Sequence, residues 1–224
     1  MKKESQILLI RKYPTLYTDN CQDAKKTVKQ RGFNCGDGWF TLIQTLSELL
    51  IERSPTCIAT LAEETYGTLD FEITNYKAED YDFLHGLTTF ARCLSRNICY
   101  TCGKQGWMFN SGGMMAFCQE HCFDTYSAFE PEAVIAIPIT INGMGLMFHQ
   151  MIINLYQLAI YHQVNKMPTV HFNQPFKKNG ELQILYQGGN QIMSGMVELL
   201  LAYSKKVDEK TGEIINRSRQ SDFH

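Results

Sequence analysis

Four stretches of the chain repeat apolar residues with the period of a helix. They cover residues 39–53, 80–96, 143–162 and 189–205, and in each the apolar positions recur every three or four residues. Such a recurrence gathers apolar side chains on one face of a helix, which can then pack against a core. The pattern predicts two pairs of core helices, one pair in each half of the chain.

Two short segments, residues 68–74 and 181–187, alternate apolar and polar residues instead. A period of two places successive side chains on opposite faces of a strand, so each segment is predicted to be a half-buried strand. A continuous apolar run within residues 131–141 predicts a buried strand ahead of the third helix.

The second half of the chain repeats the spacing of the first. Gly195 follows Gly86 by 109 residues (195 minus 86), and Gly212 follows Gly103 by the same interval (212 minus 103). A fixed long period that covers one supersecondary unit is typical of an internal repeat. We therefore predict an α+β fold of two related helix–strand–helix units that arose by tandem duplication. Because few residues are identical, a chance resemblance between two such units is the alternative.

Five metal-binding side chains lie close together between residues 99 and 122. Their spacing is C-x2-C at Cys99 and Cys102, then fifteen residues, then C-x2-H at Cys118 and His121. Two thiolates on a tight turn and a second pair returned by a hairpin give the four ligands of a closed structural zinc site. The sequence predicts one structural Zn²⁺ per chain at these four residues, with Cys122 as the alternative to His121.

The repeat leaves the metal-binding residues in one copy only. Asp208 and Thr211 stand where the first copy has Cys99 and Cys102. The predicted domains are therefore a zinc-containing unit at residues 1–128, a metal-free unit at 129–213 and a polar C-terminal tail at 214–224.

Composition is that of an ordinary globular protein, with 224 residues, 44% hydrophobic and 20% charged. The net charge of −2 gives no overall basic character for nucleic acid. Residues 1–31 hold eight Lys and Arg against three acidic residues, which indicates a solvated face or a local patch for an acidic partner. The N-terminal apolar run is too short for a signal peptide, and polar residues interrupt residues 131–161, so a cytoplasmic protein with reduced cysteines and no membrane span is expected.

No set of residues forms a convincing catalytic pattern. Cys35 precedes a predicted helix and could act as a nucleophile with His85 or His149 as base, but a buried structural thiol is the simpler interpretation. The spacing of His149, His162 and His171 fits no common metal-ligand pattern. Whether the protein is an enzyme stays open, and the sequence favours a negative answer.

Three motifs in a fixed order carry a resemblance: "GFNCGDGWF", "EETYGTLDF" and "ICYTCGKQG…FCQEH". The chain resembles, over roughly residues 10–122, a group of small uncharacterised phage and prophage proteins. The resemblance implies a phage or prophage origin and a bound zinc, but no activity. Tyr66-Gly67-Thr68 replaces the paired glycines of that group, and the second half of the chain has no counterpart in it.

The sequence therefore predicts a non-enzymatic, zinc-stabilised interaction protein that binds a host or phage protein in the host cytoplasm. The alternative is a protein that binds or processes nucleic acid with the zinc hairpin, Lys104, Trp107 and the basic N-terminal residues. A salt-dependent complex with DNA or RNA would separate the two, because phosphate contacts weaken steeply with salt.

Overall fold

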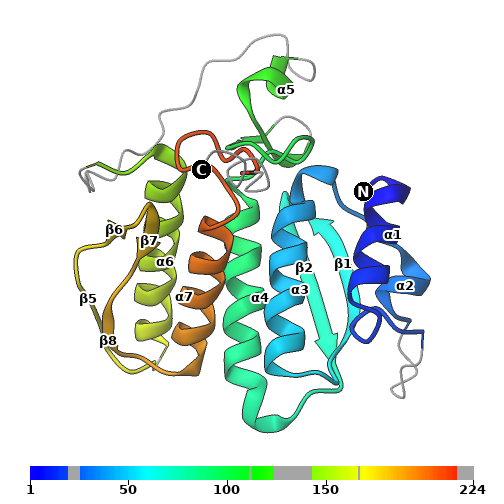
Figure 1. The fold of residues 1–224 in the computed structure, drawn as a ribbon, viewed down its shortest axis with the longest axis horizontal. Coiled ribbons are helices and arrows are strands. Elements are labelled where there is room, and N and C mark those ends of the chain that lie inside the picture. The colour runs from blue at the N-terminus through cyan, green and yellow to red at the C-terminus, as the bar shows by residue number, and fades with distance from the viewer. Residues whose placement is uncertain (20–25, 111–112, 124–142, 166, 216–224) are drawn as a thin grey trace, which may run out of the picture.

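The computed structural model describes residues 1–19, 26–110, 113–123, 143–165 and 167–215. Within these ranges the chain forms seven α-helices and four two-stranded antiparallel sheets (Figure 1), which confirms the α+β class. The helices are α1 (Lys3–Lys12), α2 (Val28–Arg31), α3 (Phe40–Arg53), α4 (Tyr81–Ser95), α5 (Gln119–Phe123), α6 (Leu146–Val164) and α7 (Gln191–Ser204). The strands are β1 (Ile58–Thr65), β2 (Thr68–Thr74), β3 (Trp107–Asn110), β4 (Met114–Phe117), β5 (Val170–Phe172), β6 (Phe176–Lys178), β7 (Glu181–Gln183) and β8 (Tyr186–Gly188).

Helices α6, α7, α4 and α3 lie side by side (Figure 1), and the hairpins contact the central helices, β2 against α4 and β7 against α7. The central pair, α4 and α7, meets at two glycines. A Cβ atom on Gly86 would lie 2.1 Å from the carbonyl oxygen of Ile192, and one on Gly195 would lie 2.2 Å from that of Phe83. The two backbones therefore approach so closely that both positions require a residue without a side chain.

The first hairpin pairs β1 with β2 through a two-residue turn at Tyr66 and Gly67. Both turn residues have positive φ, 50° and 76°, as the tight turns that suit a twisted hairpin require. The sequence predicted β2 at its observed bounds and missed β1. A register shift between Ala59 and Leu61 interrupts the alternation of β1, so its apolar pattern does not have a strict period of two.

The second hairpin is interrupted. β6 pairs with β7 and, beyond a break, β5 pairs with β8. The turn at Asn179 and Gly180 again has positive φ at both residues, 52° and 76°. The strand predicted at residues 181–187 is thus split into β7 and β8. The strand predicted within 131–141 lies outside the described residues.

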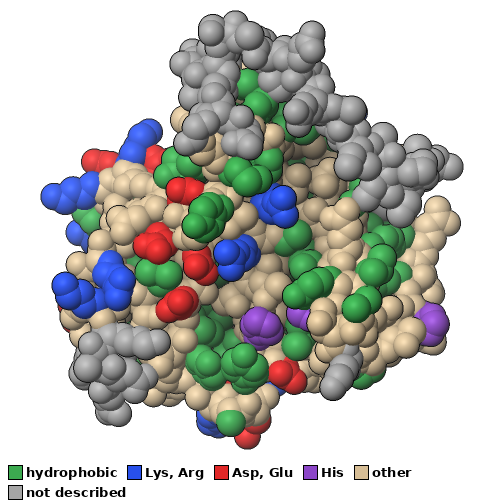
Figure 2. Space-filling view, turned by 180° about the vertical axis from the view of Figure 1, so that it is seen from behind, with side chains coloured by type: hydrophobic (Ala, Val, Ile, Leu, Met, Phe, Trp, Pro, Cys, Tyr) green, Lys and Arg blue, Asp and Glu red, His purple; other side chains and the backbone are tan. Residues whose placement is uncertain are grey.

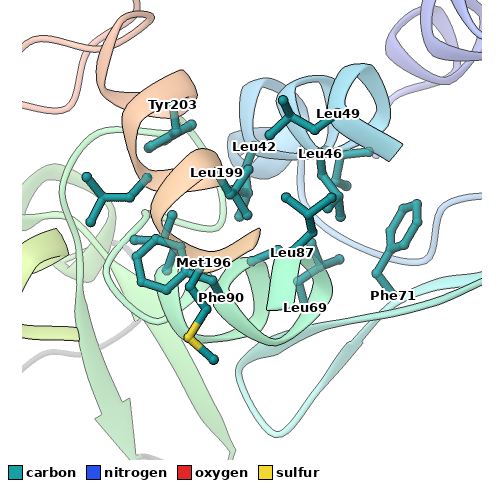
Figure 3. Packing of buried hydrophobic residues seen from close by; sticks show 14 of the residues in the cluster. Leu42, Leu46, Leu49, Leu69, Phe71, Leu87, Phe90, Met196, Leu199 and Tyr203 are labelled. Carbon is teal, nitrogen blue, oxygen red and sulfur yellow. The ribbon is translucent and has the colours of Figure 1, made fainter. Parts of the chain in front are cut away.

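One hydrophobic core runs through both halves (Figure 3). Leu46 of α3, Leu87 and Phe90 of α4, and Met196 and Leu199 of α7 are all fully buried in it. These side chains come from the predicted helical stripes, so the helical periodicity identified the core correctly.

Candidate metal centre

The predicted ligands come from two segments that the fold brings together above the end of α4. Cys99 and Cys102 lie on the cysteine turn, which we define as residues 98–106. Its ends join through a bridge between Ile98 and Gln105, and the amide of Cys99 donates to the carbonyl of Lys104 over 2.7 Å. Gly103 closes the turn with φ +82°, which glycine adopts without strain.

The second pair follows the hairpin of β3 and β4, as the sequence predicted. Cys118 comes directly after β4, and His121 lies on the short helix α5. The Sγ atoms of Cys102 and Cys118 are 3.7 Å apart, and Nδ1 of His121 lies 3.2 Å from Cys118 Sγ and 3.6 Å from Cys99 Sγ.

These four ligand atoms all lie within 4.8 Å of one another. Tetrahedral zinc with bonds of about 2.3 Å to sulfur places two sulfur ligands about 3.8 Å apart, close to the observed separation. The residues therefore form a Cys3His group that could hold one metal ion, plausibly zinc. Cys122 is buried but does not belong to the group, so His121 is the fourth ligand that the geometry favours.

The electrostatics of the group fit a cation. Burial opposes ionisation of Cys99, but amide hydrogen bonds from Cys102, Cys118 and Thr101 outweigh it and lower its pKa. Burial, together with the neighbouring Cys99, raises the pKa of Cys102 to about 12. Two adjacent thiolates repel each other, so a divalent cation among the four ligands is what would let both ionise.

The turn that carries Cys99 rests on the "CGDGW" stretch. A Cβ on Gly36 would lie 2.0 Å from the carbonyl oxygen of Tyr100, and one on Gly38 would lie 1.9 Å from that of Cys99. The amide of Gly38 donates to Tyr100 over 3.0 Å, and Nε1 of Trp39 donates to Ile98 over 3.3 Å. The sequence alone did not reveal that these glycines let the backbone approach the ligand turn.

Lys104 and three of the eight N-terminal Lys and Arg residues form ion pairs within the protein. Lys104 Nζ lies 3.0 Å from Glu120 and 3.2 Å from Glu213, and three N-terminal lysines pair with Asp37, Glu48 and Asp19. On the face shown in Figure 2, basic and acidic side chains are intermixed and form no continuous basic stripe.

The other candidate residues do not assemble a site. Cys35 is buried, and burial raises its pKa to about 12, the opposite of an activated nucleophile. The carboxylate of Asp37 accepts a hydrogen bond from the amide of Lys2 over 2.7 Å. Across the described ranges, the Cys3His group is the one cluster of three or more potential ligands found, so His149, His162 and His171 form no second metal site there.

No helix among the described residues is long and apolar enough to cross a membrane. No family model matches the chain, and no curated protein and no solved structure matches it either. The resemblance to phage and prophage proteins therefore stays a prediction.

Proposed function

We propose that the protein is a non-enzymatic interaction protein whose fold is stabilised by one structural Zn²⁺. The Cys3His group carries this proposal, because four protein ligands complete the tetrahedral shell of zinc and leave no position for a substrate or a catalytic water. The ligands come from two segments, so a bound ion would hold the β3–β4 hairpin and α5 against the end of α4.

We also propose that the two halves arose by tandem duplication. The reciprocal contacts support it: Gly86 approaches the residue three positions before Gly195, and Gly195 approaches the residue three positions before Gly86. The two hairpin turns support it further, because each places a positive-φ residue before a positive-φ glycine. In this proposal the first copy, within residues 1–128, keeps the metal, and the second, within 129–213, does not.

The proposed partner is a protein of the host or of a phage, and the proposed origin is a phage or prophage. Exposed apolar side chains support a protein partner: Ile160, Tyr161 and Val164 are 62%, 62% and 80% exposed near the C-terminal end of α6. The ion pairs of Lys104 and of three N-terminal lysines count against the nucleic-acid alternative, because paired cations are less available to phosphates.

Two measurements test this function. Elemental analysis should find one zinc per chain, and a content of none or two would contradict the metal assignment. Gel-shift titrations with DNA and RNA at increasing salt should show no salt-dependent complex. A complex that weakens steeply with salt would favour the nucleic-acid alternative.

A further inference from the structure

The turn that follows α7 has the same backbone hydrogen bonds as the cysteine turn that follows α4. We call residues 207–215 the aspartate turn. Val207 bridges to Ile214 as Ile98 bridges to Gln105. The amide of Asp208 donates to Glu213 over 2.7 Å, and Gly212 closes the turn with φ +73° and donates to Asp208 over 3.0 Å.

Asp208 takes the place of Cys99 within this pattern. At Cys99, hydrogen bonds from the amides of Thr101 and Cys102 help to lower the pKa of the thiol. In the aspartate turn, the amides of Lys210 and Thr211 both donate to Asp208 Oδ1 over 2.9 Å, and Oγ1 of Thr211 lies 3.1 Å from the same oxygen. The donors are two and three residues after the acceptor in both turns.

The aspartate turn also contacts the cysteine turn. The amide of Gln105 donates to the carbonyl of Thr211 over 2.8 Å, and Lys104 Nζ lies 3.2 Å from Glu213 Oε1. A Cβ on Gly212 would lie 2.8 Å from the amide nitrogen of Gln105. Lys104 and Gln105 lie two and three residues after Cys102, and the carbonyl of Lys104 accepts a hydrogen bond from the amide of Cys99.

We propose that residues 207–215 form a metal-free counterpart of the cysteine turn, in which the Asp208 carboxylate replaces the metal-bound thiolate as acceptor, and that this turn supports the metal site. A carboxylate that accepts several local amide hydrogen bonds can fix a turn without an ion. Because the fixed turn presents the Thr211 carbonyl and Glu213 to Gln105 and Lys104, Asp208 acts as a positioning residue for the ligand turn.

Asp208→Ala and Asp208→Asn in the full chain test this proposal. Asn keeps a side-chain oxygen that can accept the same amides, so it should behave like the wild type. Ala removes the acceptor and should lower the thermal midpoint by about 2–6 °C. Asp208→Ala should also release zinc to a chromogenic chelator several-fold faster than the wild type does. Asp208→Asn should release zinc as slowly as the wild type.

The outcomes separate the parts of the proposal. The acceptor role would be overturned if Asp208→Ala had the same thermal midpoint as the wild type. It would also be overturned if Asp208→Asn lowered the midpoint as much as Asp208→Ala does. A lower midpoint with an unchanged rate of zinc release would overturn the support of the metal site. A wild-type protein without zinc would instead refute the metal centre proposed above, while the comparison of midpoints would still test the acceptor role of Asp208.

Discussion

At the scale of single residues, Cys99 tests whether the Cys3His group holds a metal ion. Cys99→Ser removes a buried ligand that three amides stabilise as a thiolate, so the variant should lose zinc and be less stable. Cys57→Ser is the matched control, because Cys57 is also buried, but its Sγ lies 3.7 Å from the carbonyl of Leu50 and a hydroxyl can donate there. Elemental analysis should find zinc in the control and none in Cys99→Ser; equal zinc in both would contradict the site.

Glu48 gives stability a dependence on pH at the residue scale. Burial opposes its ionisation, but hydrogen bonds from Lys12, Lys206 and Tyr13 outweigh it and lower its pKa to about 2. Because its pKa is lower in the folded state than in the unfolded state, ionised Glu48 stabilises the fold. This stabilisation is fully present above the ordinary pKa of 4.5 and is lost as the pH falls toward 2.

The exposure of the Glu48 side chain limits how much its ion pairs stabilise the fold. The side chain of Glu48 is 35% exposed, so screening reduces the contribution to about 1 kcal/mol. Glu48→Gln should therefore lower the free energy of unfolding by about that amount at pH 7 and by less at pH 3, as measured by urea titration. A loss of the same size at both pH values would contradict the role of the charge.

At the scale of elements, the contact between α4 and α7 depends on its two glycines. Ala normally stabilises a helix relative to Gly by about 1 kcal/mol. Gly86→Ala should nevertheless destabilise the protein by about 1–3 kcal/mol, because its Cβ would lie 2.1 Å from the backbone oxygen of Ile192. Gly113→Ala is the control, since no atom lies within 4 Å of the added Cβ. Thermal unfolding of the two variants measures the difference, and a stabilised Gly86→Ala would contradict this packing.

The elements also show what sequence reasoning can reach. The helix predicted at residues 39–53 is observed as α3 at Phe40–Arg53, and the four residues picked out by ligand spacing lie together in a group that could hold a metal ion. Periodicity and ligand spacing are local, so one sequence suffices for them. The approach of Gly38 to Cys99 and the contact of Gln105 with Thr211 join distant segments, and no local pattern encodes them.

At the scale of the whole molecule, the shared core determines how the protein unfolds. Two separate domains at residues 1–128 and 129–213 would melt in two steps, and removal of zinc would affect mainly the first. The core cluster, however, joins Leu46 and Phe90 to Met196 and Leu199, so loss of either half exposes apolar surface of the other.

We therefore expect one cooperative unfolding transition for the zinc-loaded protein, and a chelator should lower its midpoint as a whole because an ion that binds only the folded state stabilises that state. Calorimetry with and without chelator, compared with circular dichroism, measures this. Leu200→Ala, which truncates a fully buried side chain of α7, should lower the free energy of unfolding by about 2–5 kcal/mol and move the same single transition. Two transitions, of which only one responds to the chelator, would contradict the shared core and favour two independent units.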